Sequence, residues 1–111
     1  MEFSEIKNSL KGKIPSNYSP LDYGRKFDSE IYFKYYYSRR ENTLLRISII
    51  YWEKKNIYIA QILKYKNIYS PEYANRAKFN GCEGMEIYSN YYIRLENGEY
   101  NEFNYIPTPV Y

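Results

Sequence analysis

The sequence predicts an α+β domain built on an antiparallel five-stranded sheet, with its elements in the order α, β, β, β, α, β, β. Three observations predict this class: apolar residues at helical spacing near the N-terminus, alternation of period two from residue 29 onward, and turn or cap signals between the runs. With 111 residues, the chain is expected to form a single domain, residues 1–111. Within it, residues 1–28 would form an N-terminal helix and loop, and residues 107–111 an extended tail.

The N-terminal segment predicts a short helix over residues 4–11. Ser4 could cap this helix and Gly12 could end it. Three apolar residues recur at helical spacing within or next to it: Phe3, Ile6 and Leu10. Residues 12–28 contain Pro15, Pro20, Gly24 and several serine and asparagine breaks, so they are expected to form an ordered loop.

Alternation of period two predicts three consecutive strands within residues 29–65. Polar turns at 40–43 and 53–56 would join them into an antiparallel meander. On this interpretation the odd-numbered residues of all three strands form an inner row that faces the core. Tyr35 and Tyr37 belong to this row, with their hydroxyls reaching a partner at its rim. The even-numbered residues would form an outer row on the other face.

A second helix is predicted over residues 70–81, "SPEYANRAKFNG". Ser70 is a good N-cap, Pro71 suits the first helical position, and Gly81 suits the C-terminal end. Beyond it, apolar alternation from Met85 to Leu95 predicts a strand. An Asn-Gly turn then leads to a return strand over 100–106. Without the first helix this is the element order of an OB-fold, so a partial barrel of that type is one architecture the order allows.

Composition and charge limit the class of protein. No apolar run approaches the roughly 20 residues of a membrane helix, and the N-terminus lacks the apolar stretch of a signal peptide. With a single cysteine, Cys82, the chain is expected to be cytoplasmic, in the host-cell cytoplasm if the protein is viral. The net charge of +3 is uneven, because residues 29–65 carry +4 and residues 66–111 carry −2.

The outer row of the predicted meander interleaves aromatic rings with cations, and we take it as the candidate partner-binding surface. Its members are Tyr32, Lys34, Tyr36, Arg46, Trp52, Tyr58 and Lys64. Three explanations remain open for this pattern. The N-terminal helix could cover the face, the face could bind a protein through Tyr, Trp and Arg, or the rings could stack on the bases of a nucleic acid.

The usual catalytic and metal-binding constellations are absent from the sequence. With no histidine and one cysteine, the chain cannot build the common zinc or iron sites or a histidine-based nucleophile, so no metal, cofactor or catalytic residue is predicted. "GCEG" at 81–84 is best explained by its two glycines as a helix end and a turn. A small histidine-free ribonuclease stays open, with residue types supplied by Glu53, Arg46, Lys54 and Tyr58.

The function expected from these patterns is binding without catalysis. The protein would sterically block a protein target that has an acidic or nucleic-acid-binding surface. In size and composition the chain resembles toxin-immunity proteins and viral inhibitors of host defence. Single-stranded DNA or RNA is the alternative partner, bound by an OB-like stacking face, and ribonuclease activity is the second alternative. Unpaired strand edges also allow a homodimer, whereas no membrane partner is expected. Trp52→Ala and Tyr36→Ala would weaken binding with little effect on the melting temperature.

Overall fold

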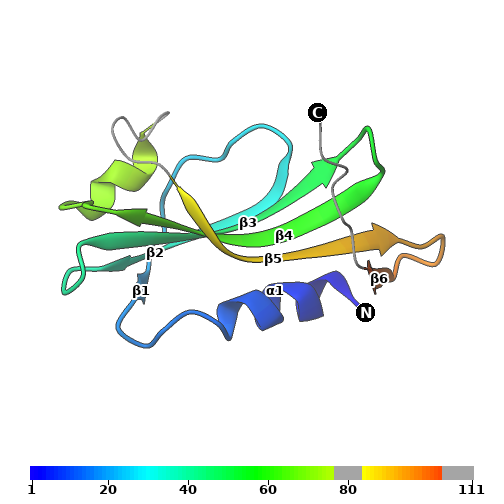
Figure 1. Ribbon diagram of the computed structural model, residues 1–111, viewed down its shortest axis with the longest axis horizontal. Coiled ribbons are helices and arrows are strands. Elements are labelled where there is room, and N and C mark those ends of the chain that lie inside the picture. Colours follow the sequence, from blue (N-terminus) through cyan, green and yellow to red (C-terminus); the bar gives the residue numbers. More distant parts are fainter. Residues whose placement is uncertain (77–83, 104–111) are drawn as a thin grey trace, which may run out of the picture.

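The computed structural model describes residues 1–76 and 84–103, which are built around one antiparallel sheet of six strands (Figure 1). The strands follow one another across the sheet in chain order. They are β1 (Ser19–Pro20), β2 (Glu30–Ser38), β3 (Thr43–Trp52), β4 (Ile57–Lys66), β5 (Met85–Arg94) and β6 (Tyr100–Phe103). The predicted antiparallel α+β class is thus confirmed. The additional strand is β1, which lies in the predicted loop and pairs with Tyr36 and Tyr37.

The order of the strands differs from that of an OB barrel. An OB-fold is a Greek-key barrel, in which strands distant in sequence become neighbours. Here every described neighbour in the sheet is also the neighbour in sequence, from β1 through to β6. The sheet is therefore a plain meander, and the OB-like partial barrel is wrong.

Two helical segments accompany the sheet. Helix α1 (Phe3–Lys11) begins with Glu2 as its N-cap, whose N–H donates to the Glu5 carboxylate at 3.0 Å. The second segment, η1 (Pro71–Asn75), begins at the predicted place but is a 3-10 helix. Arg76 already has extended backbone angles, so the predicted helix does not continue through it. The rest of that prediction, and the predicted tail, lie outside the described residues.

Each face of the sheet is covered by a different part of the chain (Figure 1). Helix α1 lies against one face, which we call the α1 face, and buries Ile6 and Leu10 there. The loop between β1 and β2, together with η1, covers part of the opposite face. Tyr35 and Tyr37 are buried on that face, as predicted. Their hydroxyls donate to the carbonyls of Arg25 and Ile68, both at 2.7 Å.

The outermost strands of the sheet are short: β1 pairs with two residues of β2, and β6 pairs with four residues of β5. One edge strand, β1, has only two residues and ends in a proline, and the register of β2 shifts between Glu30 and Tyr32. At the other edge the N–H of Tyr100 donates to the carbonyl of Met1 at 2.8 Å. Short, proline-containing and irregular edges disfavour pairing with another chain. The homodimer stays a prediction.

None of the described helices has the length and apolar character needed to cross a membrane.

Burial of tyrosine hydroxyls predicts a loss of stability in alkali. Burial raises the pKa of Tyr18 and of Tyr35 to about 12, whereas an unfolded tyrosine titrates near pH 10. The unfolded state therefore releases these protons first, and the stability they contribute, complete below about pH 10, is lost as the pH rises toward 12. We expect the urea midpoint to fall over this range, with tyrosinate absorbance rising in two phases. A single phase near pH 10 would contradict it.

Candidate functional site

The seven residues predicted to form one binding surface are divided between the two faces of the sheet. The α1 face holds Tyr32, Lys34, Tyr36, Tyr58 and Lys64, and the opposite face holds Arg46 and Trp52. The expectation of a single surface is therefore wrong. Four residues separate Ser38 from its partner Thr43, and four separate Trp52 from Ile57. A loop with an even number of residues pairs an even-numbered residue of one strand with an odd-numbered residue of the next. Even-numbered residues therefore lie on the α1 face in β2 and β4 but on the opposite face in β3.

The rings of the α1 face are largely occupied by contacts within the protein. Tyr36 is 8% exposed and belongs to the core that α1 covers. Tyr58 is half-buried, with its ring edge-on to those of Tyr51 and Tyr100 at centroid distances of 4.9 and 5.1 Å. Coverage by the N-terminal helix, one of the three explanations, is what the structure shows. Tyr36→Ala would therefore remove core packing, contrary to the expectation that it leaves the melting temperature unchanged.

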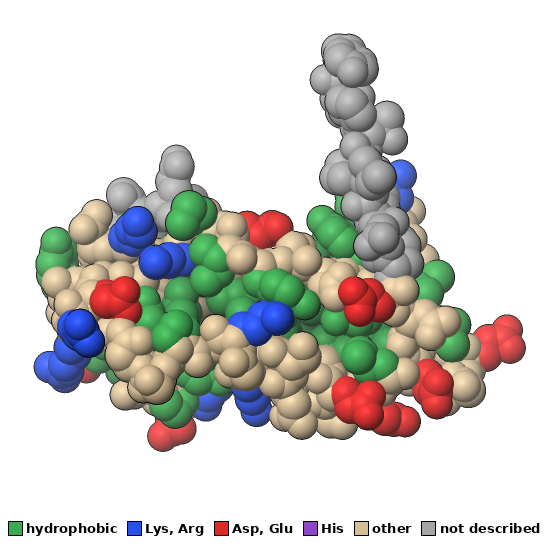
Figure 2. All heavy atoms as spheres, turned by 60° about the horizontal axis from the view of Figure 1, so that its bottom comes forward, with side chains coloured by type: hydrophobic (Ala, Val, Ile, Leu, Met, Phe, Trp, Pro, Cys, Tyr) green, Lys and Arg blue, Asp and Glu red, His purple; other side chains and the backbone are tan. Residues whose placement is uncertain are grey.

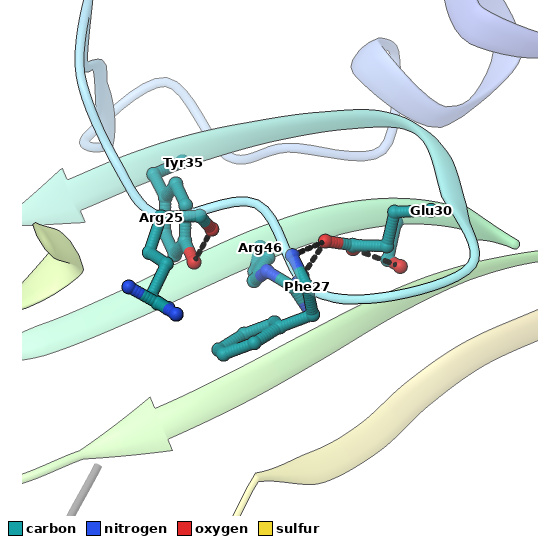
Figure 3. Close-up of polar contacts among 6 residues, drawn as sticks. Arg25, Phe27, Glu30, Tyr35 and Arg46 are labelled. Atoms are coloured by element: carbon teal, nitrogen blue, oxygen red, sulfur yellow. Dashed lines mark hydrogen bonds and ion pairs between the residues drawn. The ribbon is translucent and has the colours of Figure 1, made fainter. Parts of the chain in front are cut away.

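Arg46, predicted to bind a partner, lies inside the protein and is 3% exposed. It forms an ion pair with the buried carboxylate of Glu30 (Figure 3). That carboxylate also accepts hydrogen bonds from the Phe27 N–H at 2.6 Å and from the Ser48 hydroxyl at 2.5 Å. The guanidinium carbon lies 4.1 Å from the centre of the Phe27 ring. Arg46 thus fastens the loop before β2 to the sheet, which explains why it is buried.

The residue types proposed for a ribonuclease do not form one site. Glu53 and Lys54 lie on the turn between β3 and β4, Arg46 is buried on the opposite face, and Tyr58 belongs to the α1 face. Within residues 1–76 and 84–103, no three His, Cys, Asp or Glu residues are grouped so that they could hold a metal ion. Cys82 lies outside the described residues.

An open groove of about 680 Å³ lies between the loop before β2 and the turn that joins β3 to β4. We call it the hairpin groove. It is lined by Lys26, Ser29, Glu30, Ile31, Tyr51, Trp52, Glu53 and Lys54. Of the seven predicted residues, Trp52 lines it and is half-exposed there, while Ile31 presents a large apolar side chain that is 46% exposed. Two exposed lysines and one exposed glutamate stand beside this apolar surface, while the second glutamate of the lining, Glu30, is buried.

Hydrogen bonds hold both walls of the hairpin groove in place. On one wall, Glu30 is anchored as described above, and the carbonyl of Ser29 accepts the N–H of Tyr51 at 3.1 Å. On the other wall, the Tyr51 hydroxyl donates to Asn56 at 2.7 Å. A site whose walls are fixed before binding loses less conformational entropy when a partner docks. The groove is therefore preorganised.

Sequence reasoning missed most of the groove. Ile31 lies where the register shifts between Glu30 and Tyr32, so strict alternation wrongly placed it in the inner row. Lys26 comes from the loop and lines the groove together with the β3–β4 turn, because contacts such as the Arg46–Glu30 pair and the Tyr35 hydrogen bond to Arg25 hold that loop against the sheet. The one local sign of a turn at this place in the sequence was the polar pair Asp28 and Ser29 just before β2. Ser29 has a positive φ of 67° there.

Charge is unevenly distributed over the surface. In Figure 2, in which the side of α1 comes forward, most of the acidic side chains in view gather at the right-hand end. Lys and Arg side chains are concentrated toward the left and middle of the same view.

No family model, curated protein or solved structure matches the chain. Its function is therefore inferred from its own residues.

Proposed function

We propose that this protein is a non-catalytic inhibitor that binds a protein target through the hairpin groove and blocks it sterically. The observation that carries the proposal is the groove itself, in which Trp52 and Ile31 present apolar surface from its two walls beside two lysines. Tryptophan and tyrosine dominate the binding energy of protein interfaces because they bury a large area at low entropic cost. The proposed mode of action is that of an immunity protein or a viral anti-defence protein.

The charge at the groove indicates the kind of target. Lys26 and Lys54 stand at the groove with Glu53, so the net charge of its exposed side chains is positive. A target surface with an apolar side chain flanked by carboxylates would complement it. Stacking of successive bases is less well supported here, because Tyr36 and Tyr58, two of the predicted stacking rings, pack inside the protein. A protein target is therefore our choice over single-stranded nucleic acid at this groove.

The groove carries a built-in probe, because Trp52 is the only tryptophan of the chain. Protein captured from the native host by the wild-type chain would be purified and titrated against it. We expect the Trp52 emission to shift to shorter wavelength as the target covers the groove. Trp52→Ala should weaken binding at least ten-fold, about 1.4 kcal/mol, because it removes the central anchor.

Tyr69→Ala is the matched control, since Tyr69 is 74% exposed and does not line the groove. It should leave affinity unchanged, and melting temperatures should show that both variants stay folded. The proposal fails if a stoichiometric target is captured equally well by the Trp52→Ala and Ile31→Asp variants, or if no target is captured at all.

A further inference from the structure

Two lysines of α1 lie over one tyrosine at the margin of the α1 face, away from the hairpin groove, and a third lysine is on the same strand and face as that tyrosine. The ammonium groups of Lys7 and Lys11 lie 5.0 and 5.9 Å from the centre of the Tyr32 ring. Lys34 follows two residues after Tyr32 on the same face of β2, roughly 7 Å along the strand. We call Lys7, Lys11 and Lys34 the Tyr32 lysine cluster.

The fold itself brings these lysines together. Lys7 and Lys11 are one turn apart on α1 and so project from the same side of the helix. Because both ammonium groups lie over one ring, they are less than 11 Å from each other. Phe3 packs edge-on against the same ring at 6.5 Å and helps to fix it beneath the helix. Contact with an aromatic face also restricts the lysine side chains, which are otherwise highly mobile.

The positive charge of the cluster is not neutralised by the part of the chain that the structure describes. The two ion pairs among the described residues join Met1 to Glu99 and Arg46 to Glu30, and neither involves the cluster. Glu5, the nearest acid along α1, accepts a hydrogen bond from the N–H of Glu2. Lys11 is exposed, and Lys7 and Lys34 are partly exposed, so an anion can reach all three. Like charges held this close repel one another, and an anion that bridges them relieves the repulsion.

The arrangement also indicates which anion fits. The face of Tyr32 is already used by the two ammonium groups, so it is not free to stack on a base or to bury an apolar side chain. A ligand must therefore gain its affinity from charge alone. Among biological polymers, a nucleic acid strand carries a charge on every unit and gains from counterion release. Lysine binds phosphate as a point charge, without the fixed geometry of a planar guanidinium.

We propose that the Tyr32 lysine cluster binds the phosphodiester backbone of a single-stranded nucleic acid, independently of base sequence. This site is separate from the hairpin groove and does not depend on the protein target proposed there. It also differs from a stacking platform, because its aromatic ring positions cations and does not receive bases.

Fluorescence anisotropy with a labelled oligothymidylate of about 20 nucleotides tests the proposal, since single-strand sites usually cover fewer nucleotides than this. The triple variant Lys7→Gln, Lys11→Gln, Lys34→Gln should bind about ten-fold more weakly. The slope of log affinity against log salt should become shallower by about 2, because three phosphate contacts are lost. Tyr32→Leu should also weaken binding although it changes no charge, because the lysines lose the ring that places them.

The matched control removes the same charge elsewhere, through Lys13→Gln, Lys55→Gln and Lys66→Gln. Lys13 resembles the lysines of the cluster, because its ammonium group also lies over an aromatic ring, 4.5 Å from the centre of the Tyr88 ring. This control and Trp52→Ala should leave affinity within about two-fold of wild type. Equal loss in the two triple variants would show attraction to net charge only and overturn the proposal. Absence of binding at low salt, or tighter binding to poly-glutamate than to the oligonucleotide, would overturn it as well.

Discussion

Replacing Arg46 with methionine is expected to lower the free energy of unfolding by about 3–5 kcal/mol, because it leaves the Glu30 carboxylate buried without its counter-charge. The side chains of Arg46 and Glu30 are 4% and 1% exposed, so water cannot replace the lost guanidinium. For a domain of this size the loss corresponds to a fall in melting temperature of more than about 10 °C. Urea unfolding followed by circular dichroism measures it directly.

Two further variants separate the loss of the charge pair from the loss of side-chain bulk. Arg46→Met combined with Glu30→Gln removes the buried charge, while the amide oxygen can still accept from the Phe27 N–H and the amide NH2 can donate to the Ser48 hydroxyl. It should recover much of the lost stability. Arg94→Met removes an exposed arginine from β5 and should change stability by less than about 0.5 kcal/mol. An Arg46→Met variant within 1 kcal/mol of wild type would show that the pair contributes little.

The Arg46–Glu30 pair also links stability to the proposed function. It anchors Phe27 and Glu30, and the backbone that joins them leads into the wall of the hairpin groove. Loss of the pair should therefore disturb the surroundings of Trp52 on the facing wall. The emission of Trp52 in the folded Arg46→Met variant reports this, and an unchanged spectrum would show that the groove is held by other contacts.

Alternation and turn signals along the chain were sufficient to locate five of the six strands, β2 to β6. The turn predicted at 53–56 lies between β3, which ends at Trp52, and β4, which runs over Ile57–Lys66. Tyr35 and Tyr37 were correctly placed in the core, because the period within one strand depends only on local backbone geometry. The Asn-Gly turn was also located from local residues, but it spans three residues and not the two expected, because the N–H of Leu95 donates to the carbonyl of Glu99 at 2.7 Å; Gly98 has a positive φ of 88°.

The prediction that even-numbered residues of all three strands share one face failed. Which face they occupy depends on the number of residues in each loop, and alternation within a strand does not determine that number. One residue more or less between Ser38 and Thr43 would reverse which face Arg46 occupies. The pattern of rings and cations around Tyr36 was read as an open surface, whereas Lys7 and Lys11 from α1 supply cations to the neighbouring ring of Tyr32. The sequence held these residue types, but only the packing of α1 identifies which of them meet.

Replacing Gly24 with alanine is expected to lower the free energy of unfolding by about 3 kcal/mol, for two reasons that act together. Gly24 has a φ of 143°, which residues with a side chain rarely adopt. A Cβ atom there would also lie 2.2 Å from a ring carbon of Tyr35. That ring is fully buried, and its hydroxyl donates to the carbonyl of Arg25, so it cannot move aside easily. Thermal unfolding of the variant measures the cost.

Gly98→Ala distinguishes backbone strain from the clash, because Gly98 also has a positive φ but no atom within 4 Å of the position of a Cβ. It should cost about 1 kcal/mol, from the backbone alone. The double variant Gly24→Ala, Tyr35→Leu should be less destabilised than the sum of its single variants, since the smaller side chain makes room for the methyl group. Equal losses for the two glycine variants would show that contact with Tyr35 is not what requires glycine at position 24. Strict additivity in the double variant would lead to the same conclusion. The loop that leads to Phe27 would then be held in place by its own backbone conformation and by the Arg46–Glu30 pair.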